Sequence, residues 1–231
     1  MTTIASNMQA VHTAMDAAAR AAGRPAGEVA LLAVSKTFPA EAIRAAYLAG
    51  QRRFAENYVQ EALAKIGELG ELDIEWHFVG PIQSNKTRQI AENFSWVHSV
   101  ERLKIAQRLS AQRPAHLPPL QVCIEVNISG EASKSGVTPD EVMALALAVA
   151  ALPNLKLRGL MAIPFPTDDV TEQHAAFARL RASFEQLNQT GMQLDTLSMG
   201  MSHDFPVAIA EGATIVRVGT AIFGMRTKSQ V

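Results

Sequence analysis

The sequence alternates short apolar runs with amphipathic stretches along most of its length. An alanine-rich stretch at residues 3–22 has spaced apolar positions and ends at Gly23 and Pro25, which predicts a leading amphipathic helix. The first apolar run, residues 29–35, is continuous and does not alternate with polar positions. Such a run is typical of a strand that is buried on both faces, as in a parallel sheet covered by helices.

Eight such strands are predicted, and a helix or a short helical turn follows each of them. The predicted strands are residues 29–35, 53–57, 75–80, 96–100, 120–127, 155–163, 196–200 and 214–219. The predicted helices between them are residues 39–50, 58–69, 85–93, 101–113, 139–152, 169–190 and 203–211, and residues 222–225 continue the last strand or turn back. Strict alternation implies parallel strands with right-handed crossovers.

Eight such units close into a (β/α)8 barrel of the TIM type, so this α/β fold is our prediction. An open, doubly wound sheet is the alternative, because it shows the same alternation. We expect a single domain over residues 1–231, with a barrel core at about residues 29–226 and an extra N-terminal helix.

Composition narrows the classes of function. Hydrophobic residues make up 48% of the 231 positions, and 21 basic against 22 acidic residues leave a net charge of -1. A general nucleic-acid or membrane-surface binder needs a basic excess, so we expect neither partner. Cys123 is the only cysteine and the six histidines show no metal-binding spacing, so no metal is expected. No signal peptide and no membrane-spanning apolar run is apparent, which favours a soluble cytoplasmic protein.

Lys36 is the most informative polar residue, because it directly follows the first buried strand. In a barrel, functional side chains gather at the carboxyl ends of the strands. A lysine at the inner rim is costly to bury unless it is paired or used, and desolvation favours the neutral amine that Schiff-base chemistry needs. The alternative is a lysine whose head group reaches solvent at a strand end.

The loops after the last two predicted strands have the character of a phosphate site. Ser198 and Ser202 lie among small residues, and Gly219-Thr220 follows the last strand. Glycine lets a backbone N–H approach a phosphate, hydroxyls donate to it, and a short helix that begins near Ser202 would add its dipole. The alternative is that the glycines only turn the chain and the serines cap a helix.

Arg217 lies on the last strand, and alternation along that strand points it inward. It is either a pocket residue or a core arginine paired with a carboxylate such as Glu56 or Glu125. Together with a reactive lysine and a phosphate site, an inward arginine suits a pocket for a phosphorylated aldehyde.

Six segments in order along the chain carry a resemblance to a known family. They are AVSKT (residues 33–37), HFVGPIQSNKTR (77–88), VNISGEASKSG (126–136), GLMAIP (159–164), SMGMSHDF (198–205) and VRVGTAIFG (216–224). From about Leu31 to Arg226 the chain resembles the pyridoxal phosphate homeostasis proteins, which are related to the barrel domain of alanine racemase.

The resemblance implies that pyridoxal 5′-phosphate is held as an internal aldimine on Lys36. It implies that Ser202, Gly219 and Thr220 hold the phosphate with Ser198 close by, that Arg217 faces the pyridine nitrogen, and that Asn57 and Met161 lie beside the ring. Lys86 and Lys134 lie in the QSNKT and SKSG motifs. They are either solvated loop lysines or residues that assist cofactor loading, release or partner contact.

The family is described as non-catalytic, and the residues agree with that description. An arginine only donates, so it leaves the ring nitrogen unprotonated and stabilises a carbanion poorly. Tyr47 and Tyr58 fall on predicted helices, and no second domain is apparent that supplies a racemase's other base or its dimer. We therefore expect a monomeric cofactor carrier without catalytic residues, which meets cofactor-free enzymes only transiently. A racemase of low activity and a Schiff-base lyase acting on a sugar phosphate are the alternatives.

Overall fold

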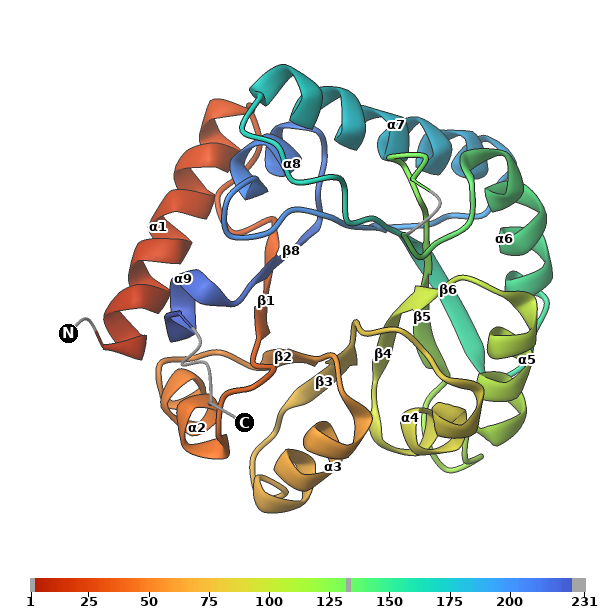
Figure 1. Ribbon diagram of the computed structural model, residues 1–231, viewed down its shortest axis with the longest axis horizontal. Coiled ribbons are helices and arrows are strands. Elements are labelled where there is room, and N and C mark those ends of the chain that lie inside the picture. The colour runs from red at the N-terminus through yellow and green to blue at the C-terminus, as the bar shows by residue number, and fades with distance from the viewer. Residues whose placement is uncertain (1–2, 132–133, 226–231) are drawn as a thin grey trace.

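The chain forms a closed barrel of eight parallel strands inside a ring of helices, as the alternation predicts (Figure 1). The computed structural model describes residues 3–131 and 134–225. The strands are β1 (Ala30–Val34), β2 (Arg53–Glu56), β3 (Glu75–Phe78), β4 (Trp96–Val100), β5 (Leu120–Glu125), β6 (Leu155–Met161), β7 (Thr196–Ser198) and β8 (Ile215–Val218). The helices are α1 (Ile4–Ala21), α2 (Ala40–Leu48), α3 (Val59–Glu68), α4 (Thr87–Asn93), α5 (Leu103–Gln112), α6 (Val142–Ala150), α7 (Val170–Gln189), α8 (Phe205–Ala210) and α9 (Thr220–Phe223), with 3-10 turns η1 (Ser84–Lys86) and η2 (Pro139–Glu141).

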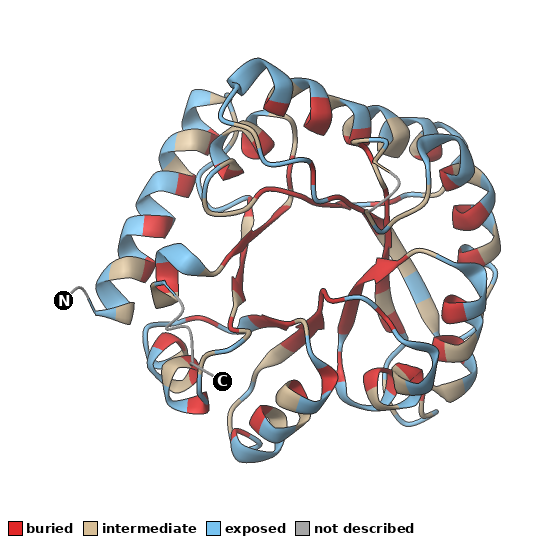
Figure 2. Cartoon of the chain, in the orientation of Figure 1, coloured by how far each residue is buried: buried red, intermediate tan, exposed pale blue. Residues whose placement is uncertain are grey.

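Pairing between the first and last strands closes the barrel and excludes the open sheet. β8 lies parallel to β1, with Ala30 opposite Ile215 and Ala33 opposite Val218. Every residue of β4 and β8 is buried, and Figure 2 shows burial along the strands and on the inner sides of the helices. Side chains fill the inside of the barrel and helices cover the outside, which explains why a strand such as β1 is a continuous apolar run.

Helix α1 is the extra N-terminal helix, and it packs against α8, α9 and α2 (Figure 1). Its buried side chains, Met8, Val11, Met15 and Ala19, recur every three or four residues and form one apolar face. Because α8 and α9 are short, α1 supplies much of the apolar cover on this side of the barrel. Asn7 ties the helix to α9 by donating to the carbonyl oxygen of Ile222 at 2.8 Å.

Two predictions near the carboxyl end of the chain are wrong. Residues 222–225 neither continue β8 nor turn back as a strand, because the Gly219 carbonyl accepts the N–H groups of Ile222 and Phe223 and closes the turn that becomes α9. A short apolar run does not by itself distinguish a helix from a strand. Helix α8 begins at Phe205 and not near Ser202, so the serine stands in the loop before it.

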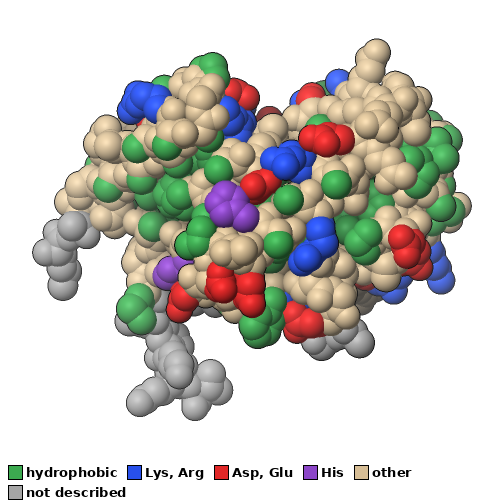
Figure 3. Space-filling view, turned by 90° about the horizontal axis from the view of Figure 1, so that it is seen from above, with side chains coloured by type: hydrophobic (Ala, Val, Ile, Leu, Met, Phe, Trp, Pro, Cys, Tyr) green, Lys and Arg blue, Asp and Glu red, His purple; other side chains and the backbone are tan. Residues whose placement is uncertain are grey.

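Charges of both signs are interspersed on the face of the molecule that Figure 3 shows from above. Among residues 3–131 and 134–225, no helix is long and apolar enough to cross a membrane.

Candidate functional site

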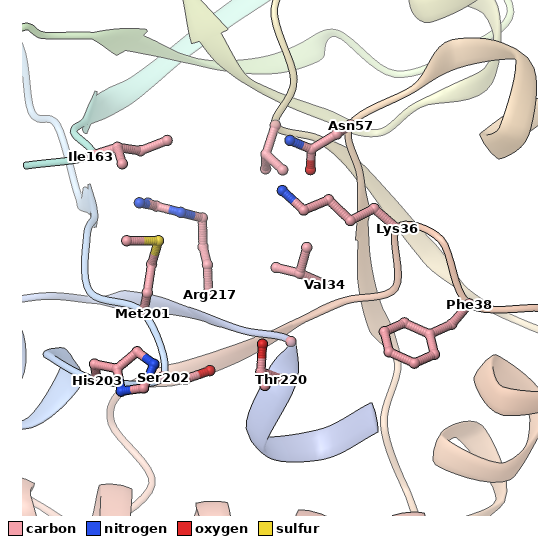
Figure 4. Close-up of a pocket in the computed structure, with 12 residues that line it drawn as sticks. Val34, Lys36, Phe38, Asn57, Ile163, Met201, Ser202, His203, Arg217 and Thr220 are labelled. Carbon is pink, nitrogen blue, oxygen red and sulfur yellow. The ribbon is translucent and has the colours of Figure 1, made fainter. Parts of the chain in front are cut away.

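A pocket opens at the carboxyl ends of the barrel strands, where the sequence predicts polar side chains (Figure 4). Its volume is about 200 Å³. The residues that line it are Val34, Lys36, Phe38, Asn57, Val79, Ile163, Met201, Ser202, His203, Arg217, Gly219 and Thr220. This end of a TIM-type barrel is where functional side chains gather, so the pocket is the candidate site.

The structure brings six of the eight predicted cofactor-binding residues together in this pocket. They are Lys36, Asn57, Ser202, Arg217, Gly219 and Thr220. The other two, Met161 and Ser198, do not line it, because both are fully buried in the barrel. Met161 packs with Trp96 and Cys123 in a small apolar cluster, and Ser198 bonds other barrel side chains.

Lys36 follows β1 by two residues and is half-buried, and its amine extends into the pocket toward Asn57 (Figure 4). The Oδ1 atom of Asn57 is buried and has no hydrogen-bond partner among the described residues. The backbones of Asn57 and Gly80 approach so closely that only glycine fits at position 80, since a Cβ atom there would lie 2.1 Å from the Asn57 carbonyl oxygen. The pocket thus presents an amine beside an unsatisfied amide oxygen, which favours a polar ligand.

Arg217 lies on β8 with 4% of its surface exposed, and its guanidinium reaches the pocket. It donates from Nη1 to the carbonyl and hydroxyl oxygens of Ser198, at 2.6 and 2.8 Å, and from Nη2 to the Ala162 carbonyl at 2.9 Å. These bonds use three of the five N–H donors of an arginine. Burial lowers its pKa to about 10, so the guanidinium is still charged at neutral pH.

A chain of hydrogen bonds continues from Arg217 through the barrel interior. His98 lies 2.8 Å from the Ser198 hydroxyl through Nδ1 and 2.9 Å from His77 Nδ1 through Nε2, and His77 Nε2 lies 2.9 Å from Glu75 Oε1. The hydrogen bond from His77 lowers the pKa of Glu75, and burial lowers the pKa of both histidines. An ionised carboxylate only accepts, so each neutral ring carries its proton on Nε2 and the Ser198 hydroxyl donates to His98.

Neither carboxylate that the sequence offers as a partner for Arg217 forms a hydrogen bond with it in the described structure. Glu56 accepts from Lys65 Nζ at 2.8 Å and from the Ser35 hydroxyl at 2.7 Å instead. Glu125 acts on Arg217 only through space: burial raises the pKa of this carboxyl group to about 7, nearby Glu101 adds to the rise, and Arg217 opposes it.

The predicted phosphate-binding residues come from the loops after β7 and β8. Ser202 lies in the loop before α8, Gly219 is the N-cap of α9, and Thr220 is the first residue of that helix. A Cβ atom on Gly219 would lie 3.0 Å from the Val34 carbonyl oxygen, so a larger residue would crowd the end of β1. These loops place two hydroxyl groups on one side of the pocket (Figure 4).

The sequence analysis did not identify the apolar side chains that line the pocket or the imidazole ring of His203. Val34, Phe38, Val79, Ile163 and Met201 supply the walls, and the exposed His203 stands beside Ser202. Apolar residues at strand ends look the same whether they face a pocket or the core. Their position at, or just after, the carboxyl ends of predicted strands was the available signal.

Lys86 and Lys134 do not line the pocket. Lys86 ends the turn η1, and Lys134 lies 3.5 Å from a Glu131 carboxylate oxygen and 5.3 Å from the centre of the Phe165 ring. Within residues 3–131 and 134–225, no three His, Cys, Asp or Glu residues are grouped to hold a metal ion.

Comparison with known proteins gives consistent matches over the whole length of the chain. Residues 6–227 match the family described as "Alanine racemase, N-terminal domain". The chain is 64% identical to the pyridoxal phosphate homeostasis protein of Pseudomonas aeruginosa over 98% of its own length and 97% of that protein. It is 53% identical to the protein of the same name in Escherichia coli K12, and both chains are fully covered.

A solved structure agrees with these matches. The structure of PipY from Synechococcus elongatus PCC7942 with PLP bound superposes with a TM-score of 0.83, at 39% identity over 96% of this chain and all of PipY. The chain therefore belongs to the alanine racemase N-terminal domain family and, within it, to the pyridoxal phosphate homeostasis proteins.

Proposed function

We propose that this protein binds pyridoxal 5′-phosphate in the pocket at the carboxyl ends of the strands and holds it covalently on Lys36. Its role is to carry the cofactor and maintain its supply, without turning over a substrate. The observation that carries the proposal is the convergence of the Lys36 amine, the Arg217 guanidinium and two hydroxyl groups on one pocket. PipY, which is similar to this protein over the whole length of PipY, has a solved structure with PLP bound.

The residues of the pocket fit this cofactor. Two basic side chains suit its negative charge, and apolar side chains such as Val34, Val79 and Ile163 suit the flat faces of its ring. The buried Oδ1 atom of Asn57 has no partner within the described residues, so a polar ligand would satisfy a group that is otherwise costly to bury.

Each pocket residue has a task in this proposal. Pyridoxal phosphate supplies an aldehyde that condenses with a primary amine and releases water. Lys36 provides that amine, and Ser202, Gly219 and Thr220 hold the phosphate. Arg217 keeps donors free for the ring nitrogen beyond its three protein hydrogen bonds.

The lack of turnover follows from the chemistry of Arg217. Its guanidinium stays charged at neutral pH and cannot pass a proton to the ring nitrogen, so carbanion chemistry is poorly supported. Cofactor-free enzymes are the proposed recipients, and the expected monomeric state and cytoplasmic location stay predictions.

The absorbance of the protein supplied with pyridoxal phosphate, followed by borohydride reduction and mass spectrometry, tests the proposal. A reduced adduct on Lys36, absent from Lys36→Ala and retained in Lys104→Ala, is the expected result. Lys104 is an exposed lysine on α5 and serves as the matched control. An unmodified Lys36 in the wild-type protein would overturn the site assignment.

A second assay separates the carrier from a racemase, which needs a base beside the substrate. His203 lines the pocket and offers such a base. Exchange of the α-proton of an amino acid in D₂O, lost in both Lys36→Ala and His203→Ala, would establish a racemase and refute the carrier.

A further inference from the structure

Lys65 is a buried lysine that lies outside the pocket. It belongs to α3, and 7% of its side chain is exposed. Its amine donates to the Ser35 carbonyl oxygen at 2.9 Å, to Glu56 Oε1 at 2.8 Å and to Glu61 Oε1 at 2.5 Å. Burying a charged lysine is expensive, and these three bonds use all three of its donors.

The first of these contacts holds the residue before Lys36. Ser35 is fully buried. Lys65 donates to the Ser35 carbonyl oxygen, and the Ser35 hydroxyl donates to Glu56 Oε1 at 2.7 Å. Its N–H also donates to the Ala55 carbonyl on β2 at 3.0 Å. Ser35 is thus fixed through its backbone and through its side chain.

Glu61, the third acceptor of Lys65, holds the residue after Lys36. Thr37 has a φ of 68°, a left-handed conformation that is rare for a β-branched residue and strains the backbone. Its N–H donates at 2.5 Å to the same Glu61 oxygen that accepts from Lys65. Strained conformations persist only where the surroundings hold them, and they cluster at functional sites.

We propose that Lys65, Glu61 and Glu56 are positioning residues that aim Lys36 into the pocket by holding the two residues on either side of it. The inference rests on the proposed function, because it concerns the readiness of Lys36 for covalent bonding. Helix α3 and strand β2 carry the three side chains, so their packing fixes the direction of the Lys36 backbone. Holding a reacting amine in one direction removes part of the entropic barrier to bond formation.

Glu61 offers the sharpest test, since it is only half-buried and its replacement spares the core. Glu61→Ala removes the oxygen that accepts from the Thr37 N–H and one of the three acceptors of Lys65, whereas Glu61→Gln keeps an oxygen at the same place. Glu68→Ala removes an exposed carboxylate from the same helix and serves as the control. Replacement of Lys65 would leave Glu56 buried without its partner, so Lys65 is not the primary target.

Hydrogen exchange of the Thr37 amide in the cofactor-free protein is the first measurement. Loss of a hydrogen bond to a charged group should speed this exchange by about tenfold in Glu61→Ala. Glu61→Gln and Glu68→Ala should stay within about threefold of the wild type. Equal protection of Thr37 in Glu61→Ala and the wild type would overturn the inference.

The rate at which pyridoxal phosphate forms its covalent adduct, followed by absorbance, is the second measurement. We expect it to fall by about tenfold in Glu61→Ala, to recover in Glu61→Gln and to be unchanged in Glu68→Ala. An unchanged rate in Glu61→Ala, with the adduct still lost in Lys36→Ala, would overturn only this inference. A wild-type protein that forms no adduct on Lys36 would overturn the proposed function, and this inference with it.

Discussion

Glu125 makes the stability of this protein depend on pH in an unusual direction. The residue ends β5 with 8% of its surface exposed, and burial raises the pKa of its carboxyl group from 4.5 to about 7. The native state therefore holds the proton more tightly than the unfolded chain does. The resulting stability is fully present below about pH 4.5 and is lost as the pH rises through 7. The rise of the pKa from 4.5 to about 7 corresponds to about 3 kcal/mol, most of which falls between pH 5 and 8.

Urea unfolding of the wild type and of Glu125→Gln at pH 5 and pH 8 measures this contribution. The glutamine variant cannot ionise, so its stability relative to the wild type should rise by roughly 2.5 kcal/mol between the two pH values. Burial lowers the pKa of His77 and His98, which produces a trend of the opposite sign as the pH falls. That trend is present in both proteins and cancels in the difference.

Glu141→Gln provides the control. Hydrogen bonds from Thr138 lower the pKa of Glu141, so its own effect on stability lies below about pH 4.5. The difference between this variant and the wild type should therefore be the same at pH 5 and pH 8. A Glu125→Gln difference that is equally flat, within about 0.5 kcal/mol, would refute the buried protonated carboxyl group.

Three further predictions concern the barrel interior. Gly159→Ala places a Cβ atom 1.8 Å from the Thr196 carbonyl oxygen and should lower the free energy of unfolding in urea by about 3 kcal/mol or more. Gly67→Ala, the control, meets open space within a helix and should raise the free energy of unfolding by about 0.5 kcal/mol. Equal stabilities of the two variants would contradict this prediction. Ser198→Ala removes the hydroxyl that donates to His98 and should lower the free energy of unfolding in urea by about 1–3 kcal/mol. An unchanged urea midpoint would argue against the hydrogen-bond chain from Ser198 through the two histidines. Long-range ¹⁵N–¹H spectra at pH 7 should show both His77 and His98 neutral with the proton on Nε2, and a proton on Nδ1 of either ring would reverse the assigned direction.

Much of the fold was predictable because it depends on local pattern. Continuous apolar runs of strand length, each followed by an amphipathic stretch, leave few arrangements other than a parallel sheet covered by helices. Lys36 was recognisable because it ends the first of these runs, and Arg217 because alternation along its strand points it inward. Closure of the barrel was a prediction that the pairing of β1 with β8 confirmed.

The prediction was wrong where a segment was short, and it did not indicate which polar groups meet inside the barrel. α9 has four residues, too few for a periodicity to appear, and a single turn of hydrogen bonds decided its structure. The small neighbours of Ser198 did not indicate its partners inside the barrel, where its hydroxyl group lies 2.8 Å from His98 Nδ1 and 2.8 Å from Arg217 Nη1.

The sequence by itself determined the alternation of strands and helices, the lysine after the first strand and the small residues at the ends of the last two strands, whereas closure of the barrel was decided by the pairing of β1 with β8. Only the tertiary structure showed that Lys65 and Glu61 hold the turn around Lys36, and that two histidines from neighbouring strands connect Arg217 to Glu75. Local periodicity reports which face of an element is buried, since burial follows the hydrophobic pattern. It does not report which polar groups meet across elements, because that depends on the register and packing of segments far apart in the chain.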